Sequence, residues 1–528
     1  MNIALLGFMG TGKTAVAKEL ARHLGMKYID TDEMIEKREK LSIPEIFARF
    51  GEDYFRKLET EVVKELSEFN NFVISTGGGV PLRRENINAL KSKGYLVCLE
   101  ASPEVILGRT KNYEGERPLL AGFIDKKKRI QELLEKRRLF YNQADFIIDT
   151  SHLSVEDVVE KVIKSLPEEK LRVNLKERSY PIFIGTSIDE VGKVTRDFSL
   201  GGKILIISDA NVFPLYGEKV RRSLEKENFQ VKFLQISPGE RSKSLSRARK
   251  IYDFCLRANL DRTSSILALG GGVVGDLTGF VAATFLRGIN FLMVPTTLLS
   301  QVDSSAGGKV GVNLPQGKNL IGAFYQPKFV LVDPLLLKTL SARRMREGVA
   351  EVVKCAIINN SFFFSYLEEN IVKALMCDLG VLRSLIKKAL EVKIKVVQED
   401  ELEEKGIRQI LNFGHTIAHA IEATSKYGRY THGEAVAIGM VGAGRIGVEM
   451  GIFSSASFFR VENLLQKAKL PTRARGLGAG KVFEALKFDK KVRAGRLFFV
   501  LPEEIGKVSL RDDVPLNLVK KVIEELIV

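Results

Sequence analysis

The chain has 528 residues, 45% of them hydrophobic and 28% charged, which indicates a globular protein too long for a single hydrophobic core. The formal net charge of +16 falls on residues 171–528, because residues 1–170 hold 28 Lys and Arg against 28 Asp and Glu. No basic stripe with interleaved aromatic residues accompanies this charge, which argues against a nucleic-acid partner and leaves a solvated basic surface or a cleft for a polyanionic small molecule.

No segment has the pattern of a membrane span or a targeting peptide. The N-terminal sequence MNIALLGFMGTGKT has no basic leader, and its glycines interrupt the apolar run, as in a strand followed by a turn. The four cysteines (98, 255, 355 and 377) are widely spaced, which argues against a disulfide framework and a thiolate metal site. We expect a cytoplasmic protein with no membrane partner, in which each cysteine is a small buried residue.

Residues 1–165 predict an α/β domain with a parallel sheet, because short apolar runs alternate with amphipathic stretches. The expected strands are residues 2–7, 27–30, 71–76, 95–100 and 146–149. The first strand leads into GFMGTGKT (residues 7–14), which satisfies G-x-x-x-x-G-K-[ST] and opens a helix, the context of a P-loop. We expect ATP phosphates to be held by Gly10, Thr11, Gly12 and Lys13, and Mg²⁺ to be bound by the Thr14 hydroxyl.

The rest of this half carries polar residues in a characteristic order. YIDTD contains Asp30 and Asp32, GEDYFRKLE contains Arg56, STGGGV contains Gly77, Gly78 and Gly79, ERPLL contains Arg117, and EKRRLFY contains Arg137. Together these motifs resemble shikimate kinase across residues 1–165. The resemblance implies a shikimate site that the arginines complete by pairing with the substrate carboxylate, formed by Asp32, Arg56, Gly77, Gly78, Gly79 and Arg137. It also implies that Asp30 lies near Mg²⁺ and the attacking hydroxyl, and that Arg117 closes over ATP in a lid around residues 109–123.

A domain boundary is expected near residues 167–170, where a predicted helix ends at Pro167 and the charged PEEK follows. Beyond it an α/β pattern returns, with strand-rich residues 171–185 and expected strands at 203–209, 230–236, 264–270, 290–295 and 329–333. From residue 336 the pattern is mainly helical. The sequence therefore predicts three domains, residues 1–168, 169–335 and 336–528.

The second α/β segment contains a glycine-rich turn, LALGGGVVGDLTGF. Gly270, Gly272 and Gly275 match G-x-G-x-x-G between a predicted strand and a predicted helix, which favours a dinucleotide pyrophosphate at the helix N-terminus. The acidic residue expected about 20 positions later is missing, and VPTT occupies that region. The pattern predicts a nucleotide site of a lineage other than the standard Rossmann unit.

Three of the five histidines, His415, His419 and His432, lie within 18 residues. The i, i+4 spacing of His415 and His419 is that of a zinc pair, and Glu422 and Glu434 lie close by in sequence. Imidazole and carboxylate ligands with an open water position are typical of a catalytic metal site. On residues alone, the predicted ligands are the three histidines.

Eight motifs in register then resemble 3-dehydroquinate synthase over about residues 171–520. They are SDANV, SPGERSK, GGGVVGDLTGFVAATFLRG, VPTTLLSQVDSSAGGKVGVN, GKNLIGAFYQP, EGVAEVVK, LNFGHTIAHAIE and HGEAV. The resemblance implies that Zn²⁺, or another divalent ion, is bound by Glu351, His415 and His432, and that His419 is a substrate or proton-relay residue.

The same resemblance implies an NAD site and a site for an anionic substrate. The NAD site would comprise Asp209, Asn211, Gly239, Glu240, Lys243, Gly271, Gly272, Val273, Asp276, Thr296, Thr297, Lys309 and Lys318. The substrate site would comprise Arg287, Asp303, Lys309, Lys318, Asn319, Lys354, Lys393, Arg408, Asn412 and His419, with catalysis by Lys309, Asn319, Lys354, Arg408 and His419. Two positions stay open: Glu403 or Glu404 in EDELEEKG, and Lys490 or Lys491 in FDKK.

Together the two resemblances imply a bifunctional enzyme of aromatic amino acid biosynthesis. One half would phosphorylate shikimate with ATP, with Lys13, Asp30 and Arg117 as catalytic residues. The other would convert 3-deoxy-D-arabino-heptulosonate 7-phosphate to 3-dehydroquinate with NAD and zinc, releasing phosphate, and would form a homodimer. The alternatives for the second half are a related sugar-phosphate cyclase and a metal-dependent polyol dehydrogenase, which the carboxylate-binding candidates Lys393 and Arg408 disfavour. Either half could instead be an inactive regulatory binder, which the intact Lys13, Asp30 and metal ligands disfavour.

Overall fold

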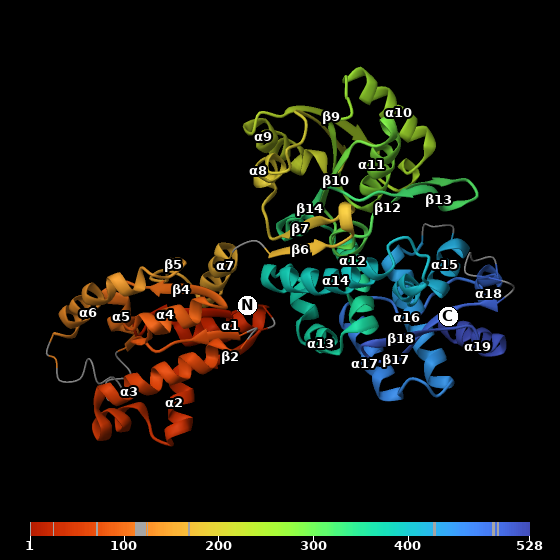
Figure 1. Cartoon of the computed structure of the whole chain (residues 1–528). Coiled ribbons are helices and arrows are strands. Elements are labelled where there is room, and N and C mark those ends of the chain that lie inside the picture. The colour runs from red at the N-terminus through yellow and green to blue at the C-terminus, as the bar shows by residue number, and fades with distance from the viewer. Residues whose placement is uncertain are drawn as a thin grey trace. The chain divides into compact units, whose positions relative to one another are not determined.

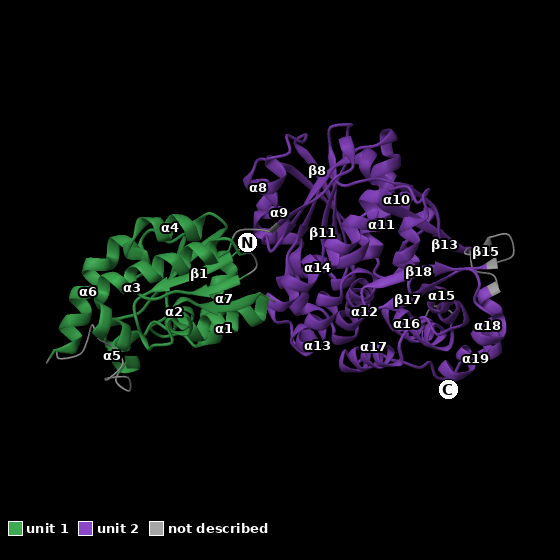
Figure 2. Ribbon diagram, turned by 60° about the horizontal axis from the view of Figure 1, so that its bottom comes forward, with its two compact units in different colours: residues 1–167 green, residues 168–528 purple. Residues whose placement is uncertain are grey.

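The computed structural model describes residues 2–24, 26–69, 72–110, 123, 125–166, 169–425, 429–487, 492–493 and 496–528. The chain divides into two units, residues 1–167 and 168–528 (Figures 1 and 2). In the described part of the chain, no helix is both long enough and apolar enough to cross a membrane.

The first unit contains a parallel sheet of five described strands in the order β2-β3-β1-β4-β5. The strands are β1 (Asn2–Gly7), β2 (Lys27–Asp30), β3 (Phe72–Ser75), β4 (Gly94–Glu100) and β5 (Phe146–Asp149). Its helices are α1 (Lys13–Leu24), α2 (Thr31–Glu39), α3 (Ile43–Ser67), α4 (Arg84–Lys91), α5 (Pro103–Thr110), α6 (Lys126–Tyr141) and α7 (Val155–Ser165).

Both faces of the sheet are buried at its central strands, which explains why β1, β3 and β4 are almost continuously apolar. Alternate residues of β1 enter different cores: Ile3 and Leu5 pack with α1 and α7, whereas Ala4 and Leu6 pack with α3 and α4. The predicted parallel α/β fold is therefore confirmed for this unit.

The second unit begins with a larger sheet, which has seven described strands in the order β6-β7-β14-β11-β10-β8-β9. All neighbours are parallel except β6 and β7. The strands are β6 (Glu169–Val173), β7 (Tyr180–Ile184), β8 (Lys203–Asp209), β9 (Gln230–Ile236), β10 (Ser265–Gly270), β11 (Asn290–Pro295) and β14 (Phe329–Val332). Helices α8 (Val191–Arg196) and α9 (Glu218–Lys226) cover one face, and α10 (Leu245–Arg257) and α11 (Gly272–Thr284) cover the other (Figure 1).

A predominantly helical part follows, as predicted. Its helices are α12 (Ala342–Asn359), α13 (Ser361–Leu375), α14 (Leu379–Glu399), α15 (His415–Thr424), α16 (His432–Glu449), α17 (Ser455–Lys467), α18 (Ala479–Lys487) and α19 (Leu516–Leu526). One apolar core joins these helices to the α10–α11 face of the sheet, so the α/β and helical parts form a single unit.

Among the described strands, three antiparallel hairpins were not predicted: β12 (Lys309–Leu314) with β13 (Gly317–Phe324), β15 (Val492–Arg493) with β16 (Arg496–Leu497), and β17 (Phe499–Glu504) with β18 (Lys507–Arg511). The first is rich in glycine, and Gly311 faces Gly322 across it. Glycine has low strand propensity, so the sequence gives little local signal there.

The four cysteines are free thiols. Cys98, Cys255 and Cys355 are buried as expected, but Cys377 is only half-buried. Cys377 follows the end of α13 and has a φ of 60°, so it lies in a tight turn rather than in the core.

Candidate functional site

The loop between β1 and α1 has the backbone of a phosphate-binding turn. Gly7, Gly10 and Gly12 have φ values of 140°, 79° and 93°, a region that residues with a Cβ rarely adopt. The Lys13 side chain folds back over the loop, and its Nζ donates to the carbonyls of Gly7 and Phe8 at 2.9 Å each. The loop thus presents backbone N–H groups and one ammonium group at the start of a helix, as binding of an anion requires.

Beside this loop lies a hydroxyl–carboxylate pair. Thr14 Oγ1 donates to Asp30 Oδ2 at 3.2 Å, and Asp30 Oδ1 accepts from the backbone N–H of Asp32 as the N-cap of α2. Burial, together with the charges of Asp30 and Glu59, raises the pKa of Asp32 to about 7. Oxygen ligands of this kind suit Mg²⁺ next to a phosphate chain.

The residues that the sequence assigned to shikimate line one cavity of about 530 Å³. It brings together Asp32, Arg56, Gly77, Gly78, Gly79 and Arg137. Arg137 donates to the Gly78 carbonyl at 3.2 Å, and a Cβ at Gly79 would lie 1.9 Å from the Arg56 guanidinium. Only glycine therefore leaves room for Arg56 in this position. Arg117 lies outside the described residues.

Glu59 also lines this cavity, and the sequence reasoning missed it. Its carboxylate is fully buried and accepts from Arg56 Nη1 at 2.9 and 3.1 Å, so it orients the guanidinium. Burial raises the pKa of Glu59 although Arg56 opposes the shift. The signal that could have found Glu59 is its i, i+3 spacing from Arg56, which puts the two on one helix face.

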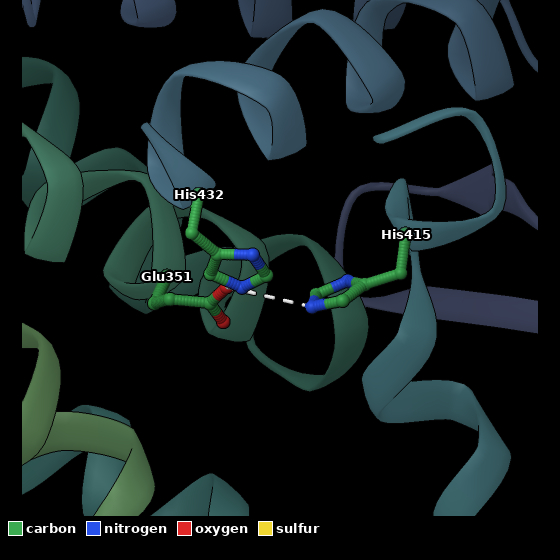
Figure 3. Close-up of side chains that lie close together, drawn as sticks. All are labelled: Glu351, His415 and His432. Atoms are coloured by element: carbon green, nitrogen blue, oxygen red, sulfur yellow. Dashed lines mark ion pairs between the residues drawn. The ribbon is translucent and has the colours of Figure 1, made fainter. Parts of the chain in front are cut away.

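In the second unit, Glu351, His415 and His432 converge from three helices (Figure 3). One ligand atom from each lies within 4.8 Å of the others. Glu351 Oε1 is 3.6 Å from His415 Nε2 and 3.4 Å from His432 Nε2. His419 is outside this group, and its ring centroid lies 5.7 Å from that of His415.

Glycines allow these helices to approach closely. A Cβ at Gly433 would lie 2.3 Å from the Glu347 carbonyl oxygen on α12, and a Cβ at Gly439 would lie 2.0 Å from the Gly414 carbonyl oxygen. The backbone of α16 therefore touches that of α12 and the start of α15. This close approach lets the side chains of Glu351, His415 and His432 reach a common point.

Glu434, which the sequence placed near the metal, has a structural role instead. It forms a capping box with Thr431 at the start of α16 and accepts two hydrogen bonds from Arg343, at 2.9 and 2.7 Å. These contacts hold His432 at the first position of α16, against α12.

The donor set fits a divalent metal. Glu351 is 1% exposed, and within the described residues neither of its oxygens accepts a hydrogen bond of normal geometry, although Lys354 is an ion-pair partner. Burial would raise the pKa of Glu351, but Lys354 and the two histidines lower it well below its usual range, so the carboxylate is ionised. Two imidazole nitrogens and one carboxylate oxygen leave a position for water or substrate, as in catalytic zinc sites.

The predicted NAD residues gather at the carboxyl edge of the larger sheet. Asp209 ends β8 and accepts from the backbone of Asn211, Gly271 caps α11, and Thr296 donates its N–H to the Gly270 carbonyl. Gly272 and Val273 lie in the first turn of α11, and Thr297 follows β11. Because parallel strands end at the same edge, this is where α/β sheets bind ligands.

Further predicted NAD residues are connected by polar contacts. Lys243 donates to Asp276 and Asn319, and Glu240, which follows Gly239, accepts from Asn313 on β12 at 2.7 Å. The β12–β13 hairpin therefore lies over the same edge.

Several predicted substrate residues form buried ion pairs. Lys393 donates to Asp303 at 2.6 Å, and Lys354 pairs with Glu351. Burial lowers the pKa of Lys393 although Asp303 opposes the shift. Such a group of cations suits a substrate that carries both phosphate and carboxylate.

Glu403, not Glu404, faces this group. Its carboxylate pairs with Lys309 and lies 3.7 Å from Arg408 Nε. It can do so because its backbone is left-handed, with a φ of 61°, a turn that sequence spacing does not reveal. Lys490 and Lys491 lie outside the described residues.

Three predicted substrate residues have other surroundings. Lys318 on β13 donates to Glu422 of α15 at 3.2 Å. Asn412 ends the 3₁₀ turn before His415. Arg287 is exposed in a left-handed turn, and among the described residues it makes no side-chain hydrogen bond or ion pair with the rest of the set.

Family models match both units. The shikimate kinase model matches residues 9–167, and the N-terminal and C-terminal models of 3-dehydroquinate synthase match residues 233–347 and 348–492.

Relatives with high identity match about two thirds of the chain. A 3-dehydroquinate synthase of Crocosphaera subtropica is 47% identical over 362 residues, which are 67% of this chain and 98% of the relative. One of Caldanaerobacter subterraneus is 48% identical over 343 residues, which are 65% and 96%.

Two solved structures of other synthases are similar in fold to about two thirds of the chain. A 2-epi-5-epi-valiolone synthase from Streptomyces hygroscopicus with NAD⁺ and Zn²⁺ bound is 27% identical, with a TM-score of 0.62 over 67% of this chain and 98% of that one. A 2-deoxy-scyllo-inosose synthase complexed with carbaglucose-6-phosphate, NAD⁺ and Co²⁺ is 28% identical, with a TM-score of 0.60 over 68% and 99%.

Proposed function

Since the chain belongs to the 3-dehydroquinate synthase family and carries a shikimate kinase domain ahead of that part, we propose that one polypeptide catalyses two reactions of aromatic amino acid biosynthesis. The first is ATP-dependent phosphorylation of shikimate to shikimate 3-phosphate. The second is conversion of 3-deoxy-D-arabino-heptulosonate 7-phosphate to 3-dehydroquinate with elimination of phosphate. The observation that carries the proposal is the convergence of Glu351, His415 and His432 in one unit, alongside a P-loop and an arginine-lined cavity in the other.

In the kinase unit, the chain's contribution is to position and neutralise charge. Lys13 and the N–H groups of the P-loop would hold the nucleotide phosphates, and Thr14 and Asp30 would hold Mg²⁺. Arg56, oriented by Glu59, and Arg137 would pair with the substrate carboxylate, and Asp32, which lines the same cavity, would accept a hydrogen bond from a ring hydroxyl.

In the synthase unit, Glu351, His415 and His432 would hold Zn²⁺ or a similar divalent ion. The metal would act as a Lewis acid on a substrate hydroxyl, and NAD would accept and return a hydride without net oxidation. Lys393, Lys354 and Arg408 would hold the anionic substrate, and His419, which lies beside the metal ligands, would move protons.

The related cyclases are the main alternative for this unit. Against them stand the identity of 47–48% to 3-dehydroquinate synthases, compared with 27–28% to the two cyclases, and the buried cations Lys393 and Arg408, which suit a substrate carboxylate. A polyol dehydrogenase would release NADH, which the proposed reaction does not.

The proposal includes three domains, residues 1–168, 169–335 and 336–528, of which the second binds NAD and the third the metal. It also includes a cytoplasmic location and a homodimer formed through the synthase unit, on the basis of the family resemblance. Sedimentation of the purified chain tests the dimer.

Metal analysis of three variants tests the assignment of the ligands. Glu351→Ala and His432→Ala should lose bound zinc and synthase activity, whereas His419→Ala should keep zinc and lose turnover. Zinc lost from the His419 variant but kept by the Glu351 variant would refute the assignment.

A further inference from the structure

Glu422 is a buried carboxylate next to the metal ligands that has no role in the proposed chemistry. It lies on α15, is 5% exposed, and faces His432 and the ammonium group of Lys318. Its Oε2 is 3.6 Å from Nδ1 of His432, and its Oε1 accepts from Lys318 Nζ at 3.2 Å. An isolated carboxylate is costly to bury, so these two contacts stabilise Glu422 at this position.

The orientation of the two imidazoles explains the need for an acceptor at this place. Both His415 and His432 direct Nε2 to Glu351 Oε1 (Figure 3). A neutral imidazole that binds a metal through Nε2 carries its proton on Nδ1, and the acceptor for that proton sets the tautomer and the ring orientation.

Each ring has a different acceptor. For His415 it is the carbonyl oxygen of Phe413, 3.1 Å from Nδ1. For His432, Glu422 is the acceptor that faces Nδ1. At 3.6 Å this pair is an ion-pair contact, and a movement of about half an ångström brings it into hydrogen-bond range.

We propose that Glu422 is a positioning residue of the metal site, which accepts the Nδ1 proton of His432 and thereby holds Nε2 toward the metal. The inference rests on the metal site of the proposed function. Lys318 holds the other carboxylate oxygen, so the β12–β13 hairpin of the α/β part is connected through Glu422 to a metal ligand of the helical part.

The test is metal affinity of the full-length protein, measured for Co²⁺ and Zn²⁺ by competition with a chromogenic chelator. Glu422→Ala should weaken binding about 10- to 100-fold, as loss of such a partner does at other metal sites, and should alter the Co²⁺ absorption spectrum. Glu422→Gln should lose less, because its amide oxygen can still accept from Nδ1. Glu347→Gln is the matched control, because Glu347 is also buried, lies one turn before Glu351 and pairs with Arg344, and it should bind metal like the wild type.

A double variant separates orientation from simple charge compensation. If Glu422 only neutralised Lys318, Lys318→Met would restore metal binding in Glu422→Ala. We expect the double variant to bind as weakly as Glu422→Ala, and restoration to wild-type affinity would overturn the proposal. Unchanged affinity and an unchanged Co²⁺ spectrum in folded Glu422→Ala would also overturn it, with the metal site intact. A wild-type protein that binds neither ion would overturn the metal site itself and this inference with it.

Discussion

Replacing Gly433 with alanine should push apart α12 and α16, two of the helices that carry the metal ligands. A Cβ there would lie 2.3 Å from the carbonyl oxygen and 2.6 Å from the Cα of Glu347, both backbone atoms of α12. Ordinary contacts begin at about 3.5 Å, so the two backbones must move apart by about 1 Å. Overpacking of this kind costs about 1–3 kcal/mol of folding stability.

The same displacement moves two metal ligands apart, because His432 precedes Gly433 on α16 and Glu351 lies one turn after Glu347 on α12. Metal–ligand distances tolerate about 0.2 Å, so metal binding must pull the helices back together against the strain. If all of that strain of about 1–3 kcal/mol opposes binding, zinc affinity falls about 5- to 150-fold.

Zinc competition titration and denaturant unfolding of the full-length variant measure both effects, and shikimate kinase activity serves as an internal control. Gly480→Ala on α18 is the matched substitution, because no atom lies within 4 Å of the Cβ position of Gly480. This variant should keep wild-type zinc affinity, and its free energy of unfolding should rise by up to about 1 kcal/mol. A Gly433→Ala protein with wild-type zinc affinity and an unchanged unfolding midpoint would refute the reasoning.

Three further predictions concern the kinase unit and the boundary between the two units. Lys13→Ala should lower shikimate phosphorylation on the order of 10³-fold or more and leave synthase activity intact; near wild-type phosphorylation would contradict the P-loop assignment. Because burial and the charges of Asp30 and Glu59 raise the pKa of Asp32 to about 7, kcat/KM for shikimate should fall about tenfold per pH unit below that value and level off above it. A flat profile across that pH would argue against a required Asp32 carboxylate. Residues 1–168 and 169–528, expressed separately, should be an active kinase and an active synthase; a folded half that works only when the other is added back would contradict independent domains.

The fold was largely predictable because its central strands are short apolar runs buried on both faces, a signal that sequence alone carries. The expected strands at 2–7, 203–209 and 290–295 coincide with β1, β8 and β11. The three hairpins were missed because their pairing depends on contacts across the strand pair and on turns rather than on a local apolar run. In β12–β13, glycines take the place of strand-forming residues.

The site residues divide in a similar way. Residues such as Lys13 and His415 lie in short motifs whose spacing indicates their chemistry, so the sequence identifies them. Glu59 pairs with Arg56 one turn away on α3, and that spacing alone does not separate a cavity residue from a surface ion pair. Glu422 acts through a tertiary contact with Lys318 of a distant hairpin, which the sequence does not reveal. The choice between Glu403 and Glu404 depends on one left-handed backbone position, which only the structure reveals.

The most direct test of two activities in one chain is an assay of the purified full-length protein with each substrate in turn. With shikimate and ATP it should form shikimate 3-phosphate and ADP. With 3-deoxy-D-arabino-heptulosonate 7-phosphate, a divalent metal and less NAD than substrate, it should release one phosphate per 3-dehydroquinate formed, with no accumulation of NADH. Accumulation of NADH in step with substrate consumption, or absence of either product from a protein that binds its metal and nucleotide, would contradict the account.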